Sequence, residues 1–477
     1  MKNKTSIYTL LILGFLINSC AKHKNEPPKM FHKEIDTYIN SIIKADKIPG
    51  IAVAVIKKGK IIHKKNYGLA NIPHNVPVTD STLFRAYSTT KLITAVAVFQ
   101  LIEAKKIDLK DPISKYIDQL PLLWKDIKIE HLLTHSSGLP EYKDFDTSMS
   151  NQTLISKMAS MPLLFEKGNK FQYNQTNFWF LQQIIEKVSN QKFDDFIIKN
   201  QFNSTYPVVF ASNSLTAIPN RVAKYQFNKE HNTYEMTTYN AGERSIAGNG
   251  LNVNLNALID WNTRFDNNQL LQNESKLKML TPFKFKNDNT PFGYSWGIFG
   301  PEGKKYYGFA GGGVSALMKF IDNDLTIIIL SNGFKNNPII SNAITYISGL
   351  SDSSLIRKDR MLNEDIRLAF LLTPYKEAFK KYKQIKNENQ KVNFERALNG
   401  LGYYYLNHNE IEKSITILKL YTEEYPNSYN AFDSLAEAYF TQKKYNLATK
   451  NYLKSLELYP DNKNAKKMLA KIKQLYE

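Results

Sequence analysis

The 477-residue sequence predicts an α+β domain, built from an antiparallel sheet flanked by helices, followed by an all-α module of helical repeats. Strand patterns near both ends of the first part of the chain, up to residue 350, with a long helical middle between them, predict the sheet and its helices. A repeat period of about 34 residues near the end of the chain predicts the helical repeats. The length by itself favours two or three domains.

The chain begins with two lysines among its first four residues and a short apolar run that ends at Ile17. This pattern is typical of a secretory signal and is too short for a permanent membrane-spanning helix. Because the only cysteine, Cys20, follows closely, residues 1–19 resemble a bacterial lipoprotein signal, which implies cleavage before Cys20 and a lipid on its sulfur. The alternative is an ordinary signal peptide with an incidental cysteine. Residues 20–30 are expected to form a polar tether.

The lipoprotein resemblance implies a protein of the bacterial cell envelope, lipid-anchored to a membrane and facing the periplasm or the exterior. The chain carries 63 Lys and Arg against 44 Asp and Glu, a formal charge of +19, but the basic residues are spread along its length. Since no basic tract is interleaved with aromatic residues, we expect no nucleic-acid partner.

The first strands are predicted directly after an amphipathic helix over residues 31–46. Pro49-Gly50 ends that helix, and the apolar run 51–56 then predicts a buried strand. A turn at Lys58-Gly59-Lys60 leads into a second strand over 61–68, so that the pair forms a hairpin.

The last strands of the domain are predicted between residues 292 and 332. Three segments rich in aromatic and β-branched residues are strand candidates: 292–298, 314–321 and 325–330. Between the first two lies a glycine-rich stretch, 306–313, that allows another backbone to approach closely. With a final helix over 337–349, a sheet formed from both ends of the domain is expected.

Ser88-Thr89-Thr90-Lys91 opens a predicted helix and carries the candidate chemistry. Residues three apart on a helix share one face, so Lys91 lies one turn from Ser88. A serine hydroxyl is a poor nucleophile until a base takes its proton, and a lysine serves as that base when burial lowers its pKa. The alternative is a helix start with a solvated lysine.

His131 and His135 are four residues apart and raise the question of a metal site on one helix face. The sequence offers no metalloprotease glutamate and no third ligand nearby. A helix that ends at a Gly-Pro loop explains the segment, so we expect neither a metal nor a cofactor.

Three local matches together resemble the serine β-lactamase and penicillin-binding-protein superfamily, in its class C-like branch. They are Ser88 to Lys91 with Phe84-Arg85 ahead of it, His131 to Pro140, and Leu325 to Asn332 after the glycine-rich strand. Their order and spacing place a β-lactamase-related serine hydrolase domain over residues 31–350. The resemblance implies the β-lactamase/transpeptidase fold, an antiparallel sheet flanked by helices.

The resemblance also implies roles for particular residues. Ser88 attacks a carbonyl and forms an acyl-enzyme, and Lys91 helps remove its proton. Tyr173 matches the first residue of the second family motif and shares proton transfer to the leaving group. The oxyanion is expected between the backbone N–H groups of Ser88 and Gly312.

Two residues depart from the family pattern. Gln175 stands where the second motif has asparagine, and its longer side chain is expected to shift a contact to Lys91 or to the substrate amide. Phe309 stands where the third motif has a lysine or histidine that helps bind a substrate carboxylate. This loss weakens the case for penicillin hydrolysis and favours a neutral ester or amide, or a site that has decayed.

The last part of the chain, 391–477, resembles tetratricopeptide repeats with a capping helix over 461–477. Leu401, Gly402 and Tyr405 recur one repeat period later as Leu435, Ala436 and Tyr439. Residues 351–390 are expected to form a helical linker. The repeats are expected to bind a protein or peptide partner or, as an equal alternative, to pack against the hydrolase domain or a second copy.

The sequence therefore predicts an envelope serine hydrolase that acts through a Ser88 acyl-enzyme on a small-molecule or peptide substrate. The bond is an ester or an amide, with D-amino-acid peptides and β-lactam-like compounds among the candidates. The alternative is a non-catalytic envelope binding or scaffold protein, with a degenerate hydrolase domain and a repeat module that recruits a protein partner.

Overall fold

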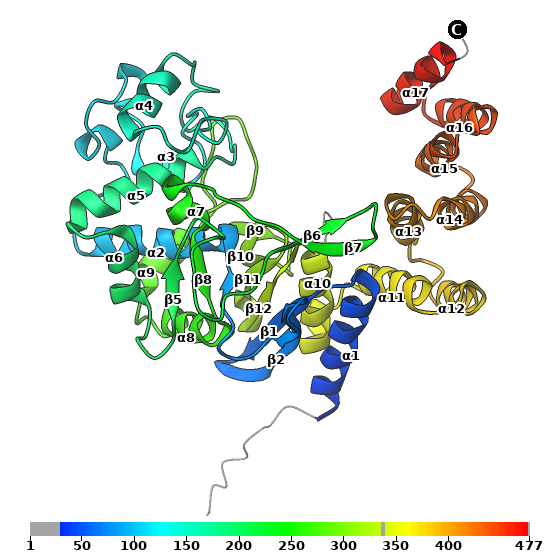
Figure 1. Cartoon of the computed structure of the whole chain (residues 1–477), viewed down its shortest axis with the longest axis horizontal. Coiled ribbons are helices and arrows are strands. Elements are labelled where there is room, and N and C mark those ends of the chain that lie inside the picture. The colour runs from blue at the N-terminus through cyan, green and yellow to red at the C-terminus, as the bar shows by residue number, and fades with distance from the viewer. Residues whose placement is uncertain (1–28, 335–338, 476–477) are drawn as a thin grey trace, which may run out of the picture.

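The computed structural model describes residues 29–334 and 339–475. Figure 1 shows a central sheet, a helical lobe on one side of it and a stack of helices that rises on the other side. The expected signal peptide over 1–19 and Cys20 lie outside the described residues. Within the described part of the chain, no helix is both long and apolar enough to cross a membrane.

Among the described residues, seven strands form one antiparallel sheet in the order β3-β2-β1-β12-β11-β10-β9. Their bounds are β1 Gly50–Lys57, β2 Lys60–Asn71, β3 Val76–Pro77, β9 Gly297–Phe299, β10 Tyr306–Gly311, β11 Ser315–Phe320 and β12 Leu325–Ser331. The first hairpin turns at Lys58 and Gly59, which both have positive φ, as a tight two-residue turn requires. The pairing of β1 with β12 confirms that the sheet is formed from both ends of the domain.

Helices cover both faces of this sheet. Alternate residues of β1 point to opposite faces, so that Ile51 and the two valines pack with α1 (Lys29–Asp46) and α10 (Ile339–Ser351). Its alanines pack on the other face with α2 (Thr90–Glu103) and α8 (Leu255–Asp266). Because every side chain of β1 except that of Lys57 is buried, this strand lies at the centre of the fold.

The strand predicted over 292–298 was wrong for most of its length, since only Gly297–Phe299 forms a strand there. The chain folds back on itself instead, with the N–H of Gly293 donating to the carbonyl of Trp296 at 2.8 Å. Ser295 at the bend has φ +66, which extended backbone does not allow. An aromatic-rich run thus forms a buried turn.

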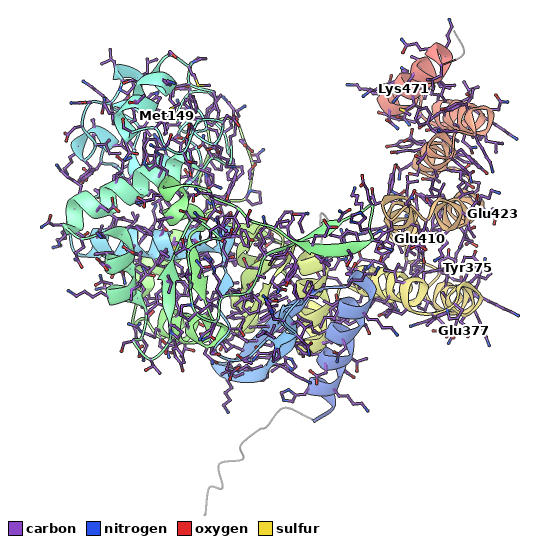
Figure 2. The ribbon with its side chains drawn as sticks, in the orientation of Figure 1. Met149, Tyr375, Glu377, Glu410, Glu423 and Lys471 are labelled. Atoms are coloured by element: carbon purple, nitrogen blue, oxygen red, sulfur yellow. The ribbon has the colours of Figure 1, made fainter. Side chains whose placement is uncertain are left out.

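The helical lobe lies between the two halves of the sheet in sequence, and two small sheets lie outside the central one, with β6 and β7 on the side of the helical stack (Figure 1). Figure 2 labels Met149 within this lobe, where its carbonyl accepts a hydrogen bond from Arg244. The lobe helices are α3 Ile129–Leu133, α4 Asn151–Ala159, α5 Thr176–Ser189, α6 Phe193–Gln201, α7 Ile246–Asn249 and α9 Asn273–Leu280. The small sheets are β4 Phe84–Arg85 with β8 Leu251–Val253 and β5 Val208–Phe210, and β6 Tyr225–Asn228 with β7 Thr233–Met236 and β13 Gly333–Phe334.

The described chain after this domain forms seven helices that share one hydrophobic core. They are α11 Lys358–Leu372, α12 Tyr375–Glu388, α13 Glu395–Asn407, α14 Ile411–Glu424, α15 Tyr429–Thr441, α16 Tyr445–Leu458 and α17 Lys463–Gln474. Tyr375 and Lys471 mark opposite ends of the stack in Figure 2. The predicted all-α module after the α+β domain is thereby confirmed.

Buried polar contacts join this stack to the sheet domain. Arg367 of α11 lies 3.0 Å from the carboxylate of the fully buried Asp46 and 2.7 Å from that of Glu364. The hydroxyl of Tyr404 donates to the carbonyl of Ala45 at 2.9 Å. Because burying these charges is unfavourable unless they stay paired, the contacts fix α11 against the end of α1.

Candidate active site

The nucleophile candidate lies at a tight turn ahead of a buried helix. Ser88 sits in a 3-10 turn, Tyr87–Thr89, that leads directly into α2, and Lys91 lies in the first turn of that helix. Tyr87 has φ +46, an uncommon conformation for a non-glycine residue that presents Ser88 to the loops around it. The fold therefore holds Lys91 one turn away from Ser88.

Three side chains surround the hydroxyl of Ser88. Its Oγ lies 2.7 Å from the Tyr173 hydroxyl, 3.1 Å from Oδ1 of Asn249 and 3.5 Å from Nζ of Lys91. Tyr173 comes from the loop before α5, and Asn249 comes from the end of α7. The fold thus brings distant segments together around one oxygen.

Lys91 is fully buried, and no carboxylate among the described residues accepts a hydrogen bond from its Nζ. Its Nζ donates instead to Oε1 of Gln175 and to the carbonyl of Gly248, each at 2.9 Å. Burial lowers the pKa of Lys91 well below its usual value, and the nearby Lys143 lowers it further while Glu141 raises it. The environment therefore favours the neutral amine.

Gln175 connects the polar groups of the site. Its Oε1 accepts from Lys91 and, at 3.2 Å, from the Asn249 amide, while its Nε2 donates to the Tyr173 hydroxyl at 3.1 Å. The glutamine thus reaches both Lys91 and Tyr173 with its amide. Desolvation raises the pKa of Tyr173 to about 12, so that this phenol stays protonated near neutral pH.

The end of β10 approaches the Ser88 turn at close range. A methyl group on Gly311 would lie 2.7 Å from the backbone nitrogen of Ser88 and 2.3 Å from the carbonyl of Ala86. Gly312 follows with φ +57 and lies against the Tyr87 ring. Only glycine allows both approaches, and they place Gly312 beside the Ser88 turn.

Phe309 presents an aromatic ring where the family pattern has a basic group. Its ring centroid lies 6.0 Å from that of Tyr173, and Nζ of Lys91 lies 6.0 Å from the same Phe309 centroid. The wall of the site on this side is therefore apolar.

The two histidines use their Nδ1 atoms as hydrogen-bond acceptors. Nδ1 of His135 accepts from the backbone N–H of Asn174 and the side-chain amide of Asn177, both at 3.1 Å, and Nδ1 of His131 accepts from the backbone N–H of Lys128. The proton of His135 must then lie on Nε2, and burial lowers the pKa of this ring well below its usual value. Its ring centroid lies 4.6 Å from that of Tyr173. His135 thus supports Tyr173 through packing, and the described residues hold no group of three or more potential ligands for a metal.

Helix α7, to which the sequence motifs assign no role, supplies two groups of the site. Asn249 contacts Ser88 through its side chain, and Gly248 contacts Lys91 through its carbonyl. A methyl group on Gly248 would lie 2.6 Å from Oε1 of Gln175 and 3.1 Å from Nζ of Lys91. The Gly248-Asn249-Gly250 run was the available signal, because such glycines indicate a close backbone approach.

Comparison with known proteins gives the site a family. The model of the Beta-lactamase family matches residues 35–348. Penicillin-binding protein 4* of Bacillus subtilis is 25% identical over 328 residues, which are 63% of this chain and 71% of that protein. Protein flp of Staphylococcus aureus is 28% identical over 174 residues, and the match spans 35% of its length.

Solved structures show the same fold. The octameric penicillin-binding protein homologue from Pyrococcus abyssi has a TM-score of 0.59 at 22% identity, over 71% of this chain and 81% of its own. SurE with D-Leu has a TM-score of 0.54 at 20% identity, over 66% and 74%. Because the family match spans well over half of the sequence, the chain belongs to the β-lactamase and penicillin-binding-protein family of serine hydrolases.

Proposed function

We propose that this protein hydrolyses an ester or amide through an acyl-enzyme on Ser88, with D-amino-acid peptides among its substrates. The observation that carries the proposal is the state of Lys91. A neutral amine has two N–H donors, and the carbonyl oxygens of Gln175 and Gly248 accept both of them. The lone pair of Nζ is then free to face Oγ of Ser88 at 3.5 Å.

The acylation step follows from this arrangement. Lys91 takes the hydroxyl proton as Oγ of Ser88 bonds to the substrate carbonyl carbon, and the carbonyl oxygen becomes an oxyanion. The backbone N–H groups of Ser88 and Gly312 stabilise that charge. Preorganised donors of this kind lower the barrier by roughly 3–4 kcal/mol each.

Tyr173 completes the proton path. Its hydroxyl, held by Gln175 and 2.7 Å from Oγ, gives a proton to the leaving oxygen or nitrogen as the bond to the carbonyl carbon breaks. Lys91 returns its proton to Tyr173. The same pair then takes a proton from the water that hydrolyses the acyl-enzyme.

Two observations support the substrate class. Phe309 makes the wall beside Tyr173 apolar, which suits a neutral ester or amide better than a carboxylate at that position. The family relatives include penicillin-binding proteins, and one structural neighbour is described with D-Leu.

Mass spectrometry of the intact mature protein tests the nucleophile. After exposure to a panel of activated esters and β-lactams, we expect the wild-type chain to gain the mass of one acyl group. Ser88→Ala removes the nucleophilic oxygen and should gain none.

Ser137→Ala serves as the matched control, since Ser137 is a buried serine near the site. This variant keeps Ser88, so it should gain the same acyl group as the wild-type protein. If the folded wild-type chain gains no adduct from any panel member, the non-catalytic binding role is favoured instead. The lifetime of an adduct distinguishes a hydrolase from a slow acyl-binding protein.

The rate of acylation should rise with pH through the lowered pKa of Lys91. The neutral amine is the active base, so the rate is low below this pKa and reaches a plateau above it. Rapid-mixing kinetics with one activated ester between pH 5 and pH 11 measure the midpoint, which we expect far below the usual lysine value near 10.4.

Lys143→Gln tests whether the midpoint of the pH profile is the pKa of Lys91. The Lys143 charge lowers the pKa of Lys91, so its removal should move the midpoint to higher pH. A midpoint near 10.4 in the wild-type protein contradicts a neutral Lys91 at physiological pH.

We also propose that Cys20 carries a lipid that anchors the protein to an envelope membrane. The support is the basic start, the short apolar run and the position of the only cysteine. In a bacterial host, Cys20→Ala should move the protein from the membrane fraction to the soluble fraction. Retention of that variant in the membrane fraction contradicts the anchor.

For the helices after residue 390, we propose a tetratricopeptide-type module that binds a protein or peptide partner. Helices α13 and α15 start one repeat period apart, at Glu395 and Tyr429, and α14 and α16 start with the same spacing. Gly402 packs on Leu418 so closely that a methyl group there would lie 2.3 Å from its Cδ2. We expect the full chain to be a monomer by light scattering at micromolar concentration, which leaves the module free, whereas a dimer through this module contradicts the proposal.

A further inference from the structure

A pocket of about 410 Å³ lies beside the candidate active site and has no part in the chemistry above. Its wall is formed by the segment that leads into Ser88, the loop over 214–224, the end of the β6–β7 hairpin with Tyr239, and the end of β12. A volume of this order is typical of small-molecule sites.

The pocket is strongly positive. Arg85, Arg221 and Lys224 line it, and no lining residue is acidic. None of the three forms an ion pair with a carboxylate in the part of the chain that the structure describes. The mutual repulsion of three cations around one pocket is unfavourable, and a bound anion would offset it.

Arg85 presents a desolvated guanidinium to this pocket. Its side chain is 7% exposed, and its Nε donates to the carbonyl of Asn249 at 3.0 Å. The guanidinium carbon lies 3.8 Å from the Tyr239 ring centroid and 4.8 Å from that of Tyr87. Its terminal nitrogens have no hydrogen bond to any described residue, so they are available as the paired donors that a carboxylate fits.

Lys224 and Arg221 complete the charge. Nζ of Lys224 lies 5.3 Å from the Tyr239 centroid and forms no hydrogen bond to a described residue. Burial and the charge of Arg85 both lower the pKa of Lys224, and a bound anion would offset the repulsion between these two cations. Arg221 donates to the carbonyls of Asn213, Ser214 and Thr216 and so fixes the loop that forms the outer wall.

Two contacts connect the pocket to the nucleophile. Asn249 accepts from Arg85 with its backbone carbonyl and from Ser88 with its side chain. The ring of Tyr87 contacts both the Arg85 guanidinium and Gly312. Arg85 and Ser88 are thus held by the same residue, Asn249, and the pocket begins one residue before the nucleophile, at Tyr87.

We propose that this pocket binds a carboxylate group of the substrate that acylates Ser88. The inference rests on the proposed hydrolase function, which it makes more specific. The guanidinium of Arg85 pairs with the carboxylate oxygens, and Lys224 adds a second charge. Thr237 also lines the pocket, and its buried hydroxyl has no hydrogen-bond partner among the described residues.

Matched esters test the proposal. One pair places the carboxylate on the acyl group (mono-p-nitrophenyl glutarate against p-nitrophenyl pentanoate), and the other places it on the leaving group (3-acetoxybenzoate against phenyl acetate). In at least one pair we expect the wild-type protein to prefer the carboxylate ester in kcat/KM. Lys224→Gln should reduce that preference about tenfold, the order expected for loss of one charged hydrogen bond.

Lys187→Gln is the matched control, since Lys187 is a lysine on α5 away from the pocket. It removes the same charge and should leave the preference unchanged. The esters could acylate the wild-type protein while Lys224→Gln shows the same preference as the wild type in both pairs. That result contradicts the carboxylate pocket and leaves the proposed hydrolase function unaffected.

Binding of free glutarate to Ser88→Ala, measured by calorimetry, separates the two proposals. If Lys224→Gln weakens the affinity for glutarate about tenfold, the pocket is supported even when no ester acylates Ser88. The absence of acylation then counts against the hydrolase function alone. Binding of inorganic phosphate in place of glutarate overturns the carboxylate assignment in favour of a phosphate site. Binding of neither anion overturns the pocket.

Discussion

The pairing of β1 with β12 is the constraint on which the rest of the domain depends. It sets Ile51 opposite Ser331, near the other end of the domain in sequence, and so closes the sheet around the helical lobe. Because β11 and β10 follow β12 in the sheet, this register carries Gly311 to the backbone of Ser88. The loop-closure entropy of so long a connection is offset by a strand that is buried on both faces.

Burial of Lys91 connects that architecture to chemistry. A charged ammonium without a carboxylate partner is costly in such a place, so folding itself favours the neutral amine. Two carbonyl oxygens, from Gln175 and Gly248, satisfy its donors, and the longer side chain of Gln175 also reaches Tyr173. The glutamine that replaces the family's asparagine therefore still forms a hydrogen bond with Lys91. The apolar ring of Phe309 forms one wall of the site, whereas the cations near Tyr87 line a neighbouring pocket.

Sequence patterns predicted the fold class and the grouping of Ser88 with Lys91, because helix spacing and strand alternation are local. They were wrong over 292–298, where aromatic residues with high strand propensity form a buried turn around Ser295. They also missed Asn249, because the glycines on either side of it indicate a close backbone approach but not that this approach is to the Ser88 turn. Contacts between segments that are far apart in the chain, such as Asn249 with Ser88, depend on how whole helices pack.

The sequence by itself determined the α+β domain, the helical module after it and the short motif that places a lysine one turn from a serine. Only the tertiary structure decided that this lysine is buried with carbonyl acceptors and no carboxylate in contact among the described residues, and that Arg85 lines a cationic pocket rather than pairing with an acid. Periodicity records which residues face a core, whereas the pKa of a buried group is set by every charge and dipole that the fold brings near it.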